Sequence, residues 1–217
     1  MADIFKEVDE DVRRDQMLRF WRKYRTYIVA AAVLLLIGTA AGLGWREWRE
    51  SQRLAESAEF VAALALLEQG RNAEAGQALA TFAEKARPGY AALARLREAG
   101  ARLAGGERAR AVATLDALAA DATADTLMRE VAALLAAVAA IDDGAPADVA
   151  GRLTALSVDS KPFRHLAREM QAVLALRTGD LDGARKIYID LAQDAAAPSG
   201  VRERAGEVLA SLASPKA

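Results

Sequence analysis

The chain carries an internal repeat with a spacing of 35 to 38 residues, and this spacing limits the folds that it can adopt. Four glycines mark the register: Gly70, Gly106, Gly144 and Gly179. Each glycine has a small residue seven positions before it, a small or β-branched residue five positions after it, and a large apolar residue nine positions after it. The three sets are Ala63, Ala99, Ala137 and Ala172; Ala75, Ala111, Val149 and Ala184; and Leu79, Leu115, Leu153 and Tyr188. A register shared by four copies indicates a repeat architecture in which each copy is one supersecondary unit.

We interpret each copy as a hairpin of two helices. Glycine readily adopts the left-handed conformation that ends many helices, so each of the four glycines is expected to end a first helix. The small residues then lie where the two helices cross. No segment shows the alternation of a strand, so the sequence predicts an all-α fold, an α-solenoid of about four hairpins with a C-terminal capping helix. The expected helices cover residues 51–69, 72–86, 89–104, 107–120, 125–141, 146–156, 162–178, 181–194 and 199–213.

An uncharged run of twenty residues extends from Thr26 to Trp45. As a helix it would be about 30 Å long, the thickness of the hydrocarbon core of a bilayer. Aromatic residues flank it, as in interfacial belts: Trp21, Tyr24, Tyr27, Trp45 and Trp48. The sequence therefore predicts one transmembrane helix at 26–45. The alternatives are a buried core helix and a cleaved signal peptide; against the latter, the run exceeds the usual length of roughly 7–15 residues.

Basic residues set the expected orientation. Six precede the run and three follow it: Arg13, Arg14, Arg19, Arg22, Lys23 and Arg25, then Arg46, Arg49 and Arg53. The positive-inside rule then predicts a cytoplasmic charged head at 1–25 and an external domain at 46–217. Arginine outnumbers lysine 23 to 6, which we interpret as the composition of a GC-rich bacterial genome. The expected location is a bacterial inner membrane, with residues 46–217 in the periplasm.

Two further features concern the first helix. Gly38 and Gly42 form a GxxxG pattern, which allows two helix backbones to approach closely and is a candidate helix–helix face; chance composition is the alternative. No glycine or proline occurs between Trp45 and Gln69, so the helix is expected to continue past the apolar run without a hinge.

The sequence offers little for catalysis. It has no cysteine, and from Ser51 onward 20 basic residues balance 22 acidic ones, which argues against a nucleic-acid partner. His165, the single histidine, and Glu169 lack further metal ligands and are expected to be an ordinary helix-surface pair. Asp142 and Asp143 are expected to mark a helix end. We therefore expect no enzyme activity, no cofactor, no metal and no small-molecule substrate.

The body of the chain at 46–217, with its four repeat copies, resembles a tetratricopeptide repeat (TPR) array. The best match is Gly179-Asp180-Leu181-Asp182-Gly183-Ala184 followed by Tyr188, which looks like the turn and second-helix start of that repeat. The other three copies are degenerate, and the large aromatic residue expected early in each first helix is absent apart from Phe60 and Phe163 nearby.

The whole layout is similar to the YfgM-like proteins. It combines a charged head beginning Asp3-Ile4-Phe5-Lys6-Glu7, an apolar helix ending Gly44-Trp45-Arg46-Glu47-Trp48, and a degenerate TPR body. The head looks like that of the alphaproteobacterial branch. The resemblance implies a non-enzymatic scaffold in the inner membrane, whose periplasmic domain associates with the SecYEG translocon, periplasmic chaperones and exported clients. A scaffold for envelope assembly or cell division is the alternative.

In a TPR array the first helix of each pair lines the concave surface, which predicts an apolar protein-binding groove. Its expected residues are Phe60, Leu64, Leu67, Leu93, Leu96, Leu103, Val131, Leu134, Val138, Ile141, Leu166, Val173 and Leu176. The helix 127–141 is apolar nearly all round, although a groove-lining face should meet solvent. The alternative is a closed groove, in which these residues form the core.

Overall fold

The computed structural model describes the backbone of residues 2–213 and the side chains of residues 21, 23, 25, 27 and 34–213. Over residues 2–213 the chain forms nine α-helices and no strand, which confirms the all-α prediction. The chain divides into two compact units, residues 1–57 and 58–217.

The helices after the first begin and end within two residues of the predicted positions. Their bounds are α2 Asn72–Lys85, α3 Pro88–Ala104, α4 Arg108–Ala120, α5 Thr126–Ala139, α6 Pro146–Leu156, α7 Arg164–Thr178, α8 Leu181–Gln193 and α9 Ser199–Ala213. Prolines at the first positions of α3 and α6 suit helix starts, because the N–H that proline lacks has no partner within a helix there.

The first helix, α1, runs without interruption from Ala2 to Glu68, so the helix predicted from residue 51 is continuous with residues 26–45, as the absence of glycine and proline after Trp45 predicted. Among the described residues no helix combines the length and the apolarity that a membrane crossing requires. The side chains of Thr26 and of residues 28–33, part of the predicted anchor, lie outside the described residues, as do most of those of the head. The anchor therefore stays a prediction.

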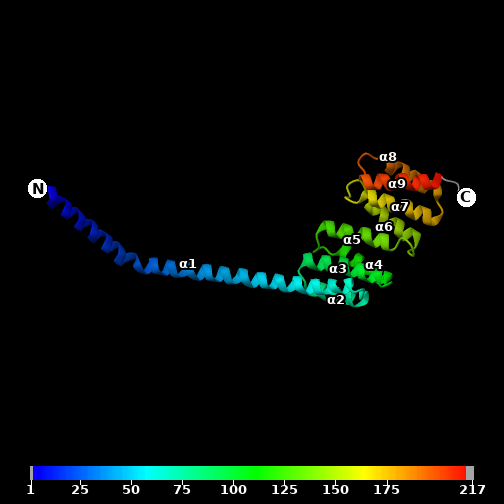
Figure 1. Cartoon of the computed structure of the whole chain (residues 1–217). Helices are drawn as coiled ribbons and strands as arrows, with labels where there is room; N and C mark the ends of the chain where they lie inside the picture. The colour runs from blue at the N-terminus through cyan, green and yellow to red at the C-terminus, as the bar shows by residue number, and fades with distance from the viewer. Residues whose placement is uncertain (1, 214–217) are drawn as a thin grey trace. The chain divides into compact units, whose positions relative to one another are not determined.

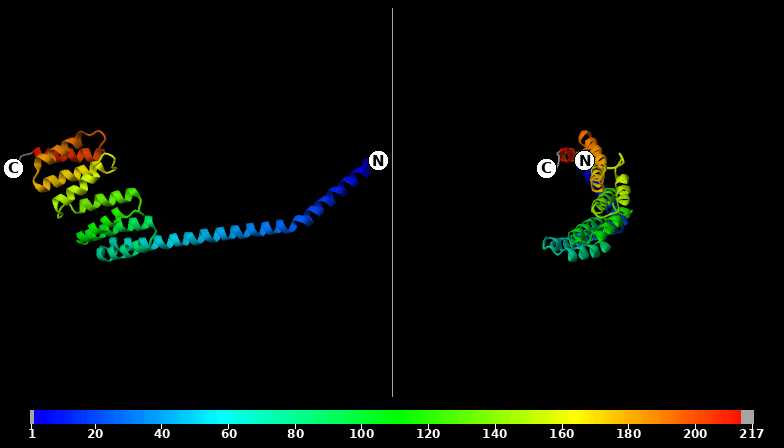
Figure 2. Two further views of the ribbon diagram at one scale, coloured as in Figure 1. Left: turned by 180° about the vertical axis from the view of Figure 1, so that it is seen from behind. Right: turned by 90° about the vertical axis from the view of Figure 1, so that its right-hand side faces the viewer.

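In the second unit the helices form antiparallel pairs that stack in chain order (Figure 1). The pairs are the end of α1 with α2, α3 with α4, α5 with α6, and α7 with α8, and α9 covers the last pair. Every residue of the three register sets is at most 4 % exposed, so the small residues do lie at the helix crossings. The right-hand view of Figure 2 shows the stacked pairs following an arc.

Three aromatic rings hold the first pair against the next helix. Phe60 of α1, Phe82 of α2 and Tyr90 of α3 have ring centroids 5.6 to 6.2 Å apart. Phe60 and Phe82 are buried in one cluster with Ala63 and Leu79. Tilted and edge-to-face contacts of this kind add to the free energy of apolar burial.

From α4 onward, arginines connect neighbouring parts of the stack that lie one repeat apart in the chain. The partners lie 33 to 36 residues apart: Arg108 with Asp142 (3.0 Å), Arg152 with Asp116 (2.9 Å), Arg177 with the Gly144 carbonyl (2.9 Å) and Arg204 with Glu169 (2.7 Å). The hydrogen-bonded carboxylates raise the pKa of Arg152 and of Arg204 above its ordinary value. These contacts fix the register of the stack, because sliding one helix pair along the next would separate each arginine from its acceptor.

The four register glycines do not all have the predicted conformation. Gly70, Gly106 and Gly179 have φ angles of 72°, 78° and 84°, as expected for left-handed helix ends. For Gly144 the prediction is wrong, because it is not among the glycines with positive φ. A Cβ at Gly144 would lie 2.6 Å from the Ala140 carbonyl oxygen and 2.9 Å from Val149, so glycine is needed there for close approach. This turn contains Asp142 and Asp143, and α5 ends early, at Ala139.

We predict that Gly144→Ala destabilises the array. The new methyl group has no room against the backbone of Ala140, and we expect a loss of about 1–3 kcal/mol in the free energy of unfolding. The matched control is Gly151→Ala inside α6, where a Cβ meets nothing within 4 Å. Since alanine favours helix over glycine, this control should gain about 0.5–1 kcal/mol. Equal melting temperatures of the two variants would contradict the assignment.

Candidate protein-binding site

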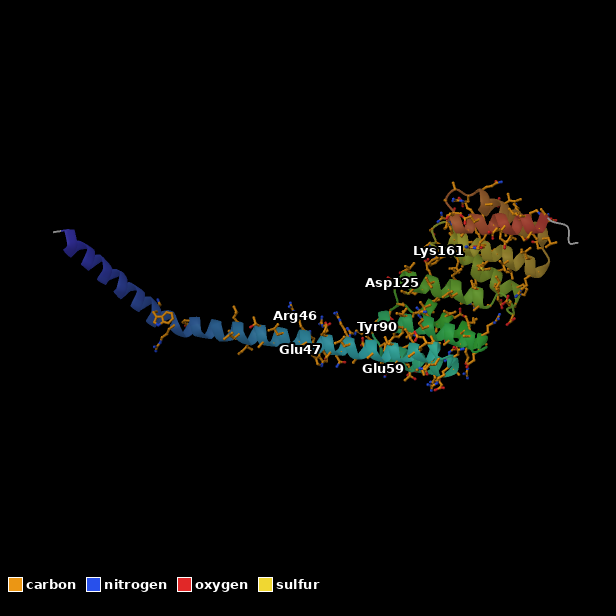
Figure 3. All side chains as sticks on the ribbon, viewed as in Figure 1. Arg46, Glu47, Glu59, Tyr90, Asp125 and Lys161 are labelled. Atoms are coloured by element: carbon orange, nitrogen blue, oxygen red, sulfur yellow. The ribbon has the colours of Figure 1, made fainter. Side chains whose placement is uncertain are left out.

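The candidate site lies on α5, which is fixed at its start by a capped turn. The carboxylate of Asp125 accepts a hydrogen bond of 2.8 Å from the Leu127 N–H. Just before it, the carboxylate of Asp121 accepts bonds from the Thr123 N–H (2.9 Å) and hydroxyl (2.7 Å), and it also pairs with Arg95 of α3. Figure 3 shows Asp125 along the same edge of the array as Tyr90 and Lys161, where the first helices of successive pairs begin. The turn therefore ties the start of α5 to the preceding pair.

One side of α5 packs against α4. Ala132 and Ala136, both fully buried, share a cluster with Leu115 and Leu118. Arg129 strengthens this contact, because its Nε donates a 3.1 Å hydrogen bond to the carbonyl oxygen of Ala119.

The opposite side of α5 packs against α6, its partner in the same pair, and against α7 of the next pair. Ala137 lies in a cluster with Val149 and Leu153 of α6, and Leu134 lies in another with Leu156 and Ala167. Near this side the carboxylate of Glu130 pairs with Lys161 at 2.9 Å. Both charged side chains of α5, Arg129 and Glu130, are thus held by neighbours.

What remains is an exposed apolar face, which we call the α5 stripe: Leu127, Val131, Leu135 and Val138. The spacing of four, four and three residues places these side chains on one side of the helix. Leu127 is 52 % exposed, Leu135 41 % and Val138 37 %, while Val131 is half-buried. The stripe spans about 16 Å and contains no charge. Contiguous apolar surface of this kind on a folded domain usually marks an interaction site.

The structure distributes the thirteen predicted groove residues over three environments. Phe60, Leu134 and Ile141 are buried. Leu103 is 40 % exposed and Val138 is the other exposed member. The remaining eight are half-buried: Leu64, Leu67, Leu93, Leu96, Val131, Leu166, Val173 and Leu176. Most of the set therefore contributes to packing between helices, and binding by it stays a prediction. The same holds for Gly38 and Gly42, at which an added Cβ would meet nothing within 4 Å.

Leu127 and Leu135, the two most exposed members of the stripe, are not among the residues predicted from the sequence. Their spacing from Val131 and Val138 was visible in the sequence. This row of side chains could not be distinguished from the other apolar rows of the same helix, however, because α5 is apolar nearly all round. Only the neighbouring helices decide which of these rows meets solvent.

His165 and Glu169 were predicted to be a pair on a helix surface, and this is wrong. Both are buried on α7, at 5 % and 6 % exposure, and they have separate partners. The His165 Nε2 atom lies 3.0 Å from the carboxylate of Asp194, and Glu169 accepts two 2.7 Å bonds from Arg204. Hydrogen bonds from the Ala196 N–H and His165 lower the pKa of Asp194. Among the described residues no three histidine, cysteine or acidic side chains gather as they would around a metal ion.

Comparison with known protein families identifies the class of the chain. A profile of the tetratricopeptide repeat-like domain matches residues 18–209, and the chain belongs to this family. No curated protein and no solved structure matches significantly. Domains of this family are typically interaction scaffolds for other proteins, so the family and the α5 stripe point to the same kind of function.

We predict that Asp121→Asn destabilises the α4–α5 turn in a pH-dependent way. The hydrogen bonds from Thr123 and then the Arg95 guanidinium lower the pKa of Asp121 from 3.8 to about 2. A lowered pKa in the folded state stabilises the fold above the ordinary pKa, and this stabilisation is lost as the pH falls through about 2. The variant should therefore melt below the parent at pH 7, and the difference should shrink as the pH approaches 2.

The measurement is a series of thermal melts between neutral and acidic pH. Asp190→Asn, at an exposed position on α8, serves as the control and should melt like the parent throughout. A melting difference for Asp121→Asn that does not change with pH would contradict the assigned role of its charge.

Proposed function

We propose that this protein is a non-enzymatic scaffold that holds other proteins at the periplasmic face of a bacterial inner membrane. The observation that carries the proposal is the α5 stripe, an uncharged apolar face on a helix that is otherwise packed on both sides. Membership of the tetratricopeptide repeat-like family supports a protein as the ligand.

The chemistry of the stripe favours an apolar segment of a partner protein. Four side chains at helical spacing offer no hydrogen-bond donor, acceptor or charge, so specificity has to come from shape. An amphipathic helix or an unfolded apolar segment would cover Leu127, Leu135 and Val138. Since the Asp125 cap and the Asp121 turn hold α5 in place, little conformational entropy would be lost on binding.

The membrane part of the proposal rests on residues 26–45 and their flanks. The run is uncharged, it carries aromatic residues at both ends, and it lies within the segment 18–209 that matches the family. The resemblance to YfgM-like proteins favours a place beside the SecYEG translocon, with periplasmic chaperones and exported clients as partners. A scaffold for envelope assembly or cell division would use the same stripe with other partners.

We predict that serine substitutions in the stripe weaken partner capture without unfolding the protein. The test variant is Leu135→Ser with Val138→Ser in the full-length chain, purified after mild solubilisation. The control is Leu181→Ser with Ile189→Ser on α8, which alters two aliphatic residues of similar exposure, 52 % and 39 %. We expect at least about a tenfold loss of captured partner for the stripe variant only, because residues at the centre of an interface contribute most of its binding free energy.

The identity of the captured proteins separates the two biological settings. Translocon subunits and chaperones would support the first, and division or outer-membrane assembly proteins the second. Undiminished capture by a stripe variant that melts like the parent would refute the stripe as the binding site. Loss of folding would assign Leu135 and Val138 to the core.

We also predict that the repeat array is accessible only from outside the cytoplasm. The chain has no cysteine, so one introduced thiol reports its own location. Ala113→Cys, at an exposed position on α4, should react with a membrane-impermeant maleimide in cells with a permeabilised outer membrane but an intact inner membrane. Labelling only after lysis of the inner membrane, or release of the protein by alkaline extraction, would contradict the proposed anchor and its orientation.

A further inference from the structure

Three arginines form a row along α1 directly after the apolar run. They are Arg46, Arg49 and Arg53, and we call them the arginine row. Their spacing of three and four residues places them on one side of the helix. Glu47 lies on another side, and Glu50 lies at the edge of the row, beside Arg46. All five side chains are exposed, and Figure 3 labels Arg46 and Glu47 on α1.

The guanidinium groups of the arginine row have no carboxylate partner. Among the described side chains none of them forms an ion pair, although Glu50 lies only three residues from Arg53. Exposed arginines of the array differ, because Arg71, Arg110 and Arg185 each pair with a carboxylate three residues away. The arginine row therefore presents three uncompensated positive charges on one side of α1.

Two tryptophans flank the row at its end nearer to the apolar run. Trp45 and Trp48 are 57 % and 55 % exposed, and their ring centroids lie 5.3 Å apart. The Arg49 guanidinium lies 5.6 Å from the centroid of the Trp45 ring, a cation–π contact that orients the arginine. Exposed indole rings, with an apolar body and one N–H donor, suit the boundary between hydrocarbon and water.

The rise of the helix places the row at the depth of lipid headgroups. At about 1.5 Å per residue, Arg49 lies ~6 Å and Arg53 ~12 Å beyond Trp45, where the apolar run ends. The headgroup layer on one side of a bilayer is about 5–8 Å thick. With the run in the hydrocarbon, Arg46 and Arg49 lie within this layer and Arg53 lies at its aqueous edge. Because α1 is unbroken here, no hinge separates the row from the run.

The chemistry of the row favours a phosphate group as its ligand. A guanidinium matches the geometry of phosphate oxygens and donates paired, charge-assisted hydrogen bonds to them. In a zwitterionic phospholipid the phosphate already has the ammonium group of its own headgroup as a partner. An anionic phospholipid lacks that group, so its phosphate is the one that an uncompensated arginine row attracts most strongly.

We propose that the arginine row binds the phosphate groups of anionic phospholipids at the outer surface of the membrane. The inference rests on the anchor proposed above and names the lipid that surrounds its outer end. Arg46 and Arg49 bind the headgroups, Trp45 and Trp48 lie against the upper part of the acyl chains, and Arg53 attracts further anionic lipid from the aqueous edge. Binding of this kind holds α1 at a fixed depth in the bilayer.

Quenching of tryptophan fluorescence tests the proposal. The chain has three tryptophans, so Trp21→Phe leaves Trp45 and Trp48 as the only reporters. The full-length Trp21→Phe chain, the parent for this test, is reconstituted into vesicles of phosphatidylcholine with a minor fraction of phosphatidylglycerol. In matched samples of the same composition, one lipid or the other carries bromine on its acyl chains. We expect phosphatidylglycerol to be enriched around the reporters at least about fivefold over its bulk fraction.

The row variant replaces all three arginines by glutamine: Arg46→Gln, Arg49→Gln and Arg53→Gln. Glutamine keeps a high helix propensity and the positions lie outside the array, so this variant should melt like the parent. Its enrichment of phosphatidylglycerol should fall to the bulk fraction. The matched control removes three arginines before the apolar run and should keep the enrichment of the parent: Arg13→Gln, Arg14→Gln and Arg19→Gln.

Equal enrichment for the row variant and the control would overturn the proposal. Quenching of the parent by the two lipids in proportion to their bulk fractions would do so as well, because the anchor would then lie in the bilayer without a preference for anionic lipid. Quenching by neither lipid would overturn the anchor itself, and the lipid site with it.

Inorganic phosphate distinguishes a lipid headgroup from a free ion. The enrichment around the parent is measured with added sodium phosphate and with sodium chloride at the same ionic strength. Since screening depends on ionic strength, a lipid site predicts equal enrichment in the two salts. A loss in phosphate alone would show that the row binds the free ion, and it would overturn the lipid as the ligand.

Discussion

The close crossing of two helices within each pair is the constraint on which the rest of this structure depends. Wherever the pairs cross, the register places alanines or a valine, and these side chains have almost no exposure to solvent. A larger residue at Ala137 or Ala184 would push the helices apart. The separation would spread to the neighbouring pair, because Leu153 and Tyr188 fill the next layer of the same clusters. Small side chains at the crossing and large ones in the next layer therefore form one packing unit.

The crossings set the distance between the two helices of a pair, and arginines help to set the position of one pair against the next. Arg108, Arg152 and Arg204 each bind an acidic side chain about one repeat away, and Arg177 binds backbone carbonyls. Exposed ion pairs contribute little free energy on their own. Glu169 differs, because its carboxylate is buried and would be left without compensation if Arg204 were removed. Asp142 and Glu169 thus connect neighbouring parts of the stack.

The α5 stripe remains exposed after these contacts are made. It lies in the middle of the stack, on a helix with too many apolar rows for its neighbours to cover. This surface suits a partner that binds along a helix.

The sequence by itself determined the helical class, the number of pairs and, to within two residues, the boundaries of the helices after the first. The period of the glycines and alanines is local information, and the burial of Ala63, Ala99, Ala137 and Ala172 followed from it. It also indicated a protein-binding repeat. The tertiary structure decided the rest. Gly144 serves close approach and not a left-handed turn, and it lies in a turn of six residues, whereas the turns within the other pairs have two or three.

The tertiary structure likewise determines which side chains of α5 are exposed to solvent. Leu134 and Leu135 are adjacent and identical in type, yet Leu134 is 9 % exposed and Leu135 41 %. Only the positions of α4, α6 and α7 distinguish them. In the same way, burial of His165 and Glu169 depended on Asp194 and Arg204, which lie 29 and 35 residues further along the chain. Periodicity shows which side chains share a helix face, but which face meets solvent depends on the helices that pack around it.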